Sequence, residues 1–135
     1  VGLERSVIAV VGDLSALHDL NALKLIAQIE PPVTVVVVNN LGGGIFAQLP
    51  IAQHEDVFRE WFLTPHEVKF EHAAALFGIA YDVPTSIPSL RESLRHAKNR
   101  NAPALIEVHS NLEEGLQARE DIRDDIITAL ASRRP

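Results

Sequence analysis

Two short polar segments contain the residue types of a metal and phosphate site, and each follows an apolar run. Asp13 follows the apolar run 7–11 after one residue, and Asn40 follows the apolar run 33–38 after one residue. Both runs are typical of buried strands. Strands joined by a right-handed crossover lie parallel in one sheet, so we expect both segments at the same carboxyl edge. The sequence therefore predicts a site for an anionic ligand and its metal at that edge.

The ligand types in these segments suit a hard divalent cation. Mg²⁺ prefers oxygen ligands and usually keeps positions open for water and phosphate. Asp13 offers a carboxylate, Asn40 offers a side-chain carbonyl, and the flexible backbone of Gly42 can turn its own carbonyl toward the same ion. Leu14 and Ser15 open the next predicted helix, where free amide hydrogens attract phosphate. We expect the metal and a diphosphate to bind side by side.

Other interpretations of the same residues stay open. A Gly-Asp pair after a strand is commonly only a turn, and a glycine run is commonly only a tight bend, so it is the combination that favours a ligand site. Ser15, His18 and Asp19 could share one face of a helix, as in a hydrolase, but the chain has no Gly-x-Ser-x-Gly elbow. A binding module without catalysis is a further alternative.

Composition narrows the class of protein. The chain has 135 residues, a formal net charge of −6 and a pI near 5.4, which disfavours nucleic acid or an anionic membrane surface as partners. Cysteine is absent, and no apolar run approaches the roughly 20 residues of a membrane helix. We expect one cytoplasmic domain. Methionine is absent even at position 1, which fits either a removed initiator or a piece of a longer protein.

Alternating strands and helices predict a parallel, doubly wound α/β sheet. The expected strands are 7–11, 33–38, 79–83 and 104–109, and the expected helices are 14–29, 58–62, 71–77, 90–97 and a last one after Asn111. The helix 14–29 is expected to be buried over most of its circumference, and the strand 33–38 to be covered on both faces. The histidines lack zinc-type spacing, so we expect surface or structural roles for them.

The pair Gly12-Asp13 with Asn39-Asn40 resembles the thiamine-diphosphate-binding motif of the decarboxylase and synthase superfamily. That motif usually begins Gly-Asp-Gly, and Leu14 stands in its third place here. Segments 12–21 and 39–46 together resemble one branch, the 2-succinyl-5-enolpyruvyl-6-hydroxy-3-cyclohexene-1-carboxylate (SEPHCHC) synthases of menaquinone biosynthesis. Two further segments are similar to the same branch, Thr64-Pro65-His66 and residues 106–108 with Glu113-Glu114 beyond them. The resemblance implies that residues 1–135 form the C-terminal part of a thiamine-diphosphate-binding domain, truncated at its N-terminus.

The resemblance also implies roles for individual residues. Asp13, Asn40 and the Gly42 carbonyl would bind Mg²⁺ or Mn²⁺. Thiamine diphosphate would contact a wider set, namely Gly12, Asp13, Leu14, Ser15, Asn40, Gly42, Gly43, Gly44 and Ile45. Ile45, Phe46 and Leu49 would form an apolar wall around the reactive ring and the substrate isochorismate. Such a wall lowers the local dielectric, which favours the less charged states of the ring.

In this family, each active site lies between two domains, and the second domain supplies a glutamate that activates the cofactor. Glu55, Glu60, Glu67 and Glu71 follow the glycine run, where they do not match that glutamate. We therefore expect no catalytic residue on this chain, and no turnover of 2-oxoglutarate and isochorismate by the chain alone. A truncated sheet exposes an edge or an apolar face, so we expect a homo-oligomer. Domains like those of acetolactate synthase or a 2-oxo acid decarboxylase are alternatives.

Overall fold

The sheet has four parallel strands in the order β1-β2-β4-β3. A computed structural model describes residues 6–132, so residues 1–5 and 133–135 of the predicted domain lie outside the described part. The strands are β1 (Val7–Gly12), β2 (Val33–Asn39), β3 (Ala80–Asp82) and β4 (Ala104–His109). In the register of β1 on β2, Gly12 pairs with Val38, so the two strands end level. The predicted parallel sheet is confirmed.

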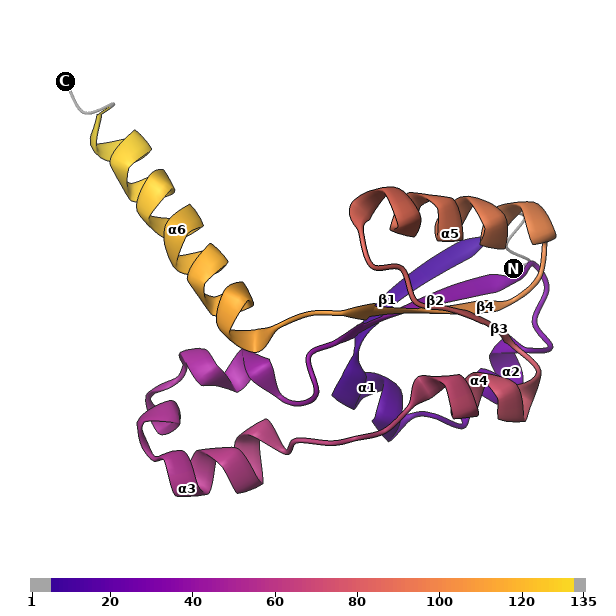
Figure 1. Cartoon of the computed structure of the whole chain (residues 1–135), viewed down its shortest axis with the longest axis horizontal. Helices are drawn as coiled ribbons and strands as arrows, with labels where there is room; N and C mark the ends of the chain where they lie inside the picture. The colour runs from indigo at the N-terminus through magenta and orange to yellow at the C-terminus, as the bar shows by residue number, and fades with distance from the viewer. Residues whose placement is uncertain (1–5, 133–135) are drawn as a thin grey trace.

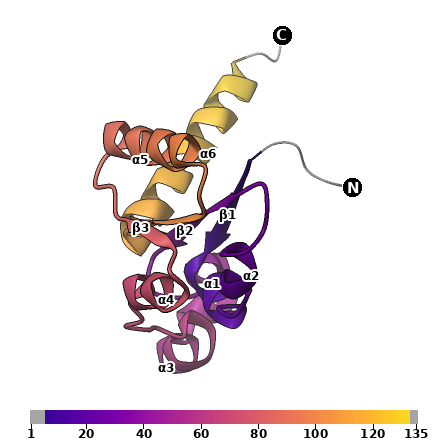
Figure 2. The ribbon, with the colours of Figure 1, turned by 90° about the vertical axis from the view of Figure 1, so that its right-hand side faces the viewer.

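Helices cover both faces of the sheet, as a doubly wound fold requires (Figures 1 and 2). One face holds α1 (Asp13–His18), α2 (Ala22–Ile26) and α4 (Phe70–Phe77), and the other holds α5 (Ile87–Arg100). Between β2 and α4 the chain forms four short helical segments, η1 (Gly44–Gln48), η2 (Pro50–Gln53), α3 (Glu55–Val57) and the wider η3 (Phe58–Leu63). The helix α6 (Leu112–Ala131) projects away from the sheet (Figure 1).

The core lies between the sheet and the helices α1, α2 and α4. Val37 and Leu105 of the central strands pack there with Phe70 and Ala74 of α4, and all four are essentially inaccessible to solvent. On the opposite face, Val36 of β2 is also buried. The prediction that this strand is covered on both faces is therefore confirmed, because β2 lies inside the sheet with a helix layer on either side.

The strand β1 is less buried than its sequence predicts. Val7, Ala9 and Val11 are half-buried, but Ile8 and Val10 on the other face are 56% and 67% exposed. β1 is an edge strand, and in the described part of the chain no helix covers that face. The expectation of a fully buried strand is wrong for this face, since an apolar run does not tell which neighbours are present.

The predicted helix 14–29 is also wrong in its extent. The chain forms two short helices, α1 and α2, which are separated by a turn at residues 19–21. Asp19 and Asn21 favour such turns because their side chains compete with helical backbone bonding. Only Leu23 of this segment's apolar residues is fully buried, whereas Leu25 is 69% exposed.

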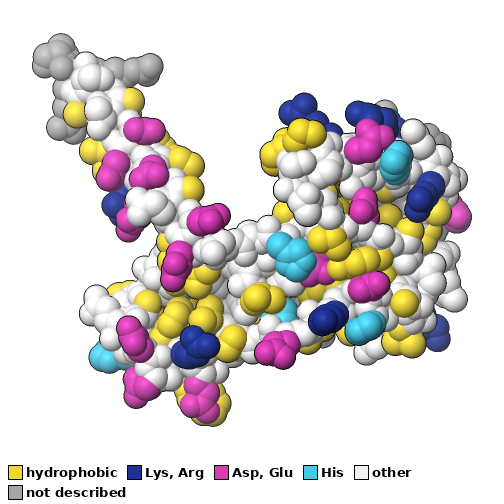
Figure 3. Space-filling view, in the orientation of Figure 1, with side chains coloured by type: hydrophobic (Ala, Val, Ile, Leu, Met, Phe, Trp, Pro, Cys, Tyr) yellow, Lys and Arg dark blue, Asp and Glu magenta, His cyan; other side chains and the backbone are white. Residues whose placement is uncertain are grey.

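The remaining boundaries follow local signals. Gly78 ends α4 in the left-handed conformation, with φ of 68°. Ser86 caps α5, which is longer than predicted, and Asn111 caps α6 by accepting hydrogen bonds from the amides of Glu113 and Glu114. Beyond its first turns every described residue of α6 is exposed, and Figure 3 shows apolar side chains along it between acidic ones. No helix in residues 6–132 is long and apolar enough to cross a membrane.

Candidate functional site

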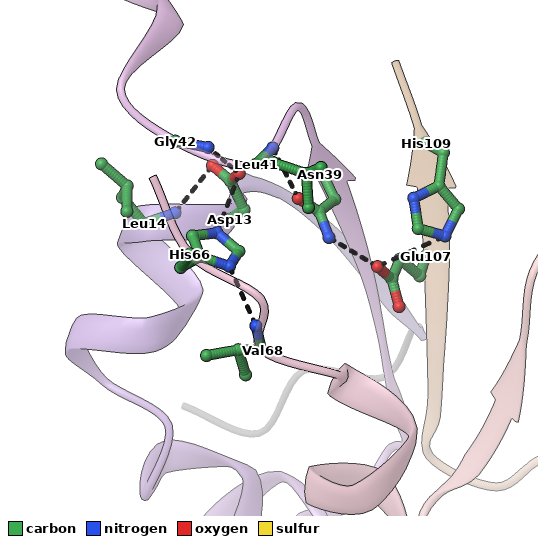
Figure 4. Close-up of polar contacts among 9 residues, drawn as sticks. All are labelled: Asp13, Leu14, Asn39, Leu41, Gly42, His66, Val68, Glu107 and His109. Carbon is green, nitrogen blue, oxygen red and sulfur yellow. Dashed lines mark hydrogen bonds and ion pairs between the residues drawn. The ribbon is translucent and has the colours of Figure 1, made fainter. Parts of the chain in front are cut away.

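Asp13 lies where β1 ends and α1 begins, and its side chain is the most enclosed polar group of the site. The residue is 3% exposed. Its Oδ1 accepts a hydrogen bond from the Leu14 amide at 2.8 Å, and its Oδ2 accepts one from the Gly42 amide at 2.8 Å (Figure 4). Two backbone donors, one in the first turn of α1 and one in the loop after β2, therefore fix the carboxylate in one orientation.

Asn40 and Gly42 converge on the same carboxylate. The Asn40 amide nitrogen donates to Asp13 Oδ2 at 3.3 Å and to the Gly42 carbonyl oxygen at 2.6 Å. Turning this amide over would place its oxygen there instead, beside the carboxylate and the backbone carbonyl. Oxygens of these three kinds are the ligands that Mg²⁺ prefers, so the chemistry of the predicted ligand set fits such an ion.

The loop after β2 packs so closely against η3 that it needs glycine at positions 42 and 43. Gly43 donates its amide to the Leu63 carbonyl at 2.6 Å. A Cβ on Gly43 would collide with the Phe62 carbonyl, and one on Gly42 would collide with that of Leu63. At Gly44, an added Cβ would lie against the Asn40 amide. The run therefore brings the loop close to η3 while leaving room for the Asn40 side chain.

A cavity of about 640 Å³ opens beside these groups. All nine residues predicted to contact the cofactor line it, as does Phe46 of the predicted apolar wall. Leu49 does not line this cavity. It lies instead in an adjoining groove between η2 and α6, and Gln48 and Arg119 border both.

Large apolar side chains at the cavity are open to solvent. Ile45 is 68% exposed and Phe46 is 38% exposed. The Phe46 ring packs edge to face against the Phe62 ring, with ring centroids 6.0 Å apart. An exposed apolar surface beside a polar floor is typical of a pocket that receives an amphipathic ligand.

The start of α1 differs from the expectation of free amides. The Leu14 amide donates to Asp13 and is not available to phosphate. α1 has only six residues, so its dipole is small. Any phosphate binding near Asp13 must therefore rely more on a cation and on the Ser15 side of the turn than the sequence alone suggests.

His66 is a site residue that the sequence interpretation missed. Its side chain is 10% exposed, and its Nε2 lies 3.1 Å from Asp13 Oδ2. The Val68 amide donates to Nδ1, so in the neutral ring Nε2 carries the hydrogen and donates to Asp13 (Figure 4). His66 is far from Asp13 in sequence, and the only available signal was the similarity of the segment 64–66 to the synthase branch.

A buried polar cluster next to the site was also missed. Glu107 on β4 is 3% exposed, and its carboxylate accepts hydrogen bonds from Asn39 Nδ2, at 2.6 Å, and from the Tyr81 hydroxyl. Burial, together with the hydrogen bond to Glu107, raises the pKa of the Tyr81 phenol. A carboxylate inside an otherwise apolar strand needs such partners, and this was the signal in the sequence.

The site has little protein charge of its own. Within residues 6–132, no group of three or more histidine or acidic side chains could hold a metal ion. Asp13 is the only carboxylate that lines the cavity in the described part, and Arg119 is its only arginine or lysine. A cation here would be bound by one carboxylate and neutral oxygens.

Comparisons with known proteins agree with this geometry. Residues 2–108 match the family described as thiamine pyrophosphate enzyme, C-terminal TPP binding domain. The chain is 41% identical to the SEPHCHC synthase of Prosthecochloris aestuarii over 96% of its own length and 22% of the relative's. It is 40% identical to that of Rubrobacter xylanophilus, over 90% of its own length and 21% of the relative's. The chain thus spans about a fifth of the length of these relatives.

A solved structure gives the same result for the fold. The thiamine diphosphate-dependent 4-hydroxybenzoylformate decarboxylase of Rhodococcus jostii RHA1 superposes with a TM-score of 0.69 and 27% identity. The match covers 80% of this chain and 20% of the decarboxylase.

Proposed function

Because the chain belongs to the thiamine pyrophosphate enzyme family through its C-terminal TPP-binding domain, we propose that it is the diphosphate- and metal-binding part of a SEPHCHC synthase. The identity of about 40% to several such synthases supports this branch. The whole enzyme would decarboxylate 2-oxoglutarate and join the remaining fragment to isochorismate. The decarboxylase likeness at 27% identity supports a 2-oxo acid decarboxylase as the second candidate.

The convergence of Asp13, Asn40 and Gly42 on one point is the observation that carries this proposal. In the proposed site, Asp13 Oδ2, the Asn40 amide oxygen and the Gly42 carbonyl hold Mg²⁺ or Mn²⁺. The fit is supported by the short distances among these groups and by a Gly42 amide that aims the Asp13 carboxylate. Gly12, Ser15, Gly43 and Gly44 line the same cavity, where backbone can approach a diphosphate closely.

The apolar wall would control the environment of the reacting centre. Thiamine diphosphate, when bound, supplies the electron sink that a 2-oxo acid needs to lose CO₂. Ile45 and Phe46 would exclude water from this centre, and the exposed Leu49 would extend the wall toward the second substrate. No glutamate lines the cavity in residues 6–132, so we place the activating carboxylate on a part of the enzyme outside this chain.

The proposal is tested by titrating the chain with Mg²⁺ and thiamine diphosphate together. We expect calorimetric binding that needs both ligands and disappears with EDTA. Absence of any such binding, in a chain shown to be folded by circular dichroism, would overturn the proposed site. The branch is tested with the second domain supplied. SEPHCHC formation from 2-oxoglutarate and isochorismate supports the synthase, whereas aldehyde release alone from a 2-oxo acid supports the decarboxylase.

We further propose that the chain alone is inactive and self-associates. The first point follows from the absence of an activating carboxylate at the described cavity, and the second from the exposed face of β1. Turnover by the isolated chain, or a monomer in light scattering at high concentration, would contradict these two points separately.

A further inference from the structure

Glu107 is a buried carboxylate that has no role in the proposed binding of the metal or the cofactor. It lies in β4 between β2 and β3, and all of its described polar neighbours are side chains of the sheet. Oε1 accepts from Asn39 Nδ2, and His109 Nε2 lies 3.5 Å from Oε1 (Figure 4). Oε2 accepts from the Tyr81 hydroxyl. Burying a carboxylate is unfavourable unless these partners are kept, so its presence calls for a reason.

Asn39 connects this carboxylate to the metal-ligand loop. Its Nδ2 donates to Glu107, and its Oδ1 accepts the Leu41 amide at 2.9 Å. The Asn39 backbone is also held, since its carbonyl accepts from the Ser110 amide. Asparagine alone offers both a side-chain donor and a side-chain acceptor of this size, because aspartate cannot donate to Glu107 when ionised.

The hydrogen bond to Leu41 matters because Leu41 is in a strained conformation. Its φ is 62°, in the left-handed region that a residue with a Cβ adopts only when its surroundings enforce it. This turn reverses the chain directly between Asn40 and Gly42, and so brings both residues to Asp13. If Leu41 relaxed, the Asn40 amide and the Gly42 carbonyl would separate from the carboxylate.

We propose that Tyr81, Glu107 and Asn39 form a positioning relay that holds the Asn40–Gly42 turn in the geometry of a metal site. The relay deepens the proposed function and rests on it. None of its three side chains touches Asp13 in the described contacts, and none lines the cavity. The relay acts through the Leu41 backbone. Tyr81 orients Glu107, Glu107 orients the Asn39 amide, and Asn39 fixes the turn.

If the relay exists, variants of its three residues should lose more metal affinity than their loss of folding stability explains. The probe is Mn²⁺ in the presence of thiamine diphosphate, measured by electron paramagnetic resonance on the 135-residue chain. Tyr81→Phe removes one hydroxyl and should weaken Mn²⁺ binding by about threefold to tenfold, and Asn39→Leu by tenfold or more. Glu107→Gln, which can still accept from Asn39, should bind more tightly than Glu107→Leu.

Ser93→Ala is the matched control. Ser93 is 6% exposed and its hydroxyl donates to Asp82, so this variant also deletes a buried hydroxyl bonded to a carboxylate, but on the α5 side of the sheet. Ser93→Ala should lower the melting temperature while leaving Mn²⁺ affinity unchanged. Equal losses of affinity in Ser93→Ala and Tyr81→Phe would overturn the relay, because general loosening would then explain both.

Hydrogen exchange tests the relay without metal. In Tyr81→Phe, exchange at the Leu41 amide should accelerate by at least about tenfold, while exchange at the Leu14 amide, which is bonded to Asp13, should not. Unchanged Leu41 exchange overturns the relay even if the chain binds Mn²⁺. Faster Leu41 exchange in a chain that binds no Mn²⁺ supports the coupling to the turn but overturns the proposed metal site, so the two failures are distinguishable.

Discussion

Gly44→Ala is the most informative single substitution at the glycine run. An added Cβ would meet the Asn40 amide within normal contact distance and would lie 2.6 Å from Leu112 Cδ1. Gly44 follows Gly43 at the start of η1 and is buried, so its surroundings have little space to yield. We expect the substitution to move the Asn40 amide away from Gly44, and thus to change the position of a proposed metal ligand.

The magnitude follows from contact distances. Carbon and amide atoms pack at about 3.5–4.0 Å, so the neighbours of the new methyl must shift by about 1 Å. Overpacking of this kind costs about 1–3 kcal/mol in stability. Metal ligands tolerate errors of only about 0.2 Å, so such a shift should remove most of the Asn40 contribution. We expect the affinity for Mg²⁺ with thiamine diphosphate to fall at least about tenfold, which corresponds to about 1.4 kcal/mol.

The assay is a paired measurement of binding by calorimetry and of stability by urea unfolding. Ser93→Ala is again the control, since it changes a buried position on α5 that does not line the cavity. That variant should lose stability in urea but bind the ligands as the wild type does. If Gly44→Ala binds Mg²⁺ within twofold of the wild type, Asn40 is not a ligand in the proposed sense and the reasoning fails.

Four further substitutions test other parts of the structure. Asp13→Asn keeps the shape but removes the one carboxylate of the site, and should lower Mg²⁺ affinity by about a hundredfold in the same titration; a change below tenfold would contradict the assignment. His66→Ala deletes a donor to a buried carboxylate and should cost about 1.5–3 kcal/mol in urea unfolding, whereas a cost below 0.5 would show that the contact contributes little. Because burial raises the pKa of the Tyr81 phenol above its usual value of about 10, its hydrogen bond should stabilise the chain fully below pH 10 and progressively less above it. The melting temperature should then fall more steeply between pH 10 and 11 in the wild type than in Tyr81→Phe, and parallel curves would refute this. Val10→Lys places a charge on the exposed face of β1 and should reduce self-association in sedimentation, with no effect expected if that face is not the contact.

The sequence predicts the centre of this fold well because strong local signals agree there. The uninterrupted β-branched run before Asn39 is typical of a strand between two helix layers, and β2 has this position. Once β1 and β2 are parallel neighbours, Asp13 and Asn40 must meet at one edge, and their contacts follow. Cap residues such as Ser86 and Asn111 set the starts of helices for equally local reasons.

The features that escaped prediction depend on contacts between distant segments. Periodicity alone favoured one long helix after Asp13, but the turn at Asp19 and Asn21 divides it. The exposure of Val10 depends on which elements are present to cover β1, and the chain's own pattern does not contain this information. His66 reaches Asp13 only because the segment after η3 returns past the end of β1, a path that no spacing rule specifies.

The single carboxylate of the site has a consequence for how ligands would assemble there. A divalent ion beside Asp13 and two neutral oxygens keeps a net charge of about +1, which the protein leaves uncompensated. Only an incoming anion completes the neutralisation, so metal and diphosphate should bind as a mutually dependent pair and neither should be retained alone. Removal of the metal by a chelator would then release the organic ligand as well, and the cellular supply of either one would set the occupancy of both.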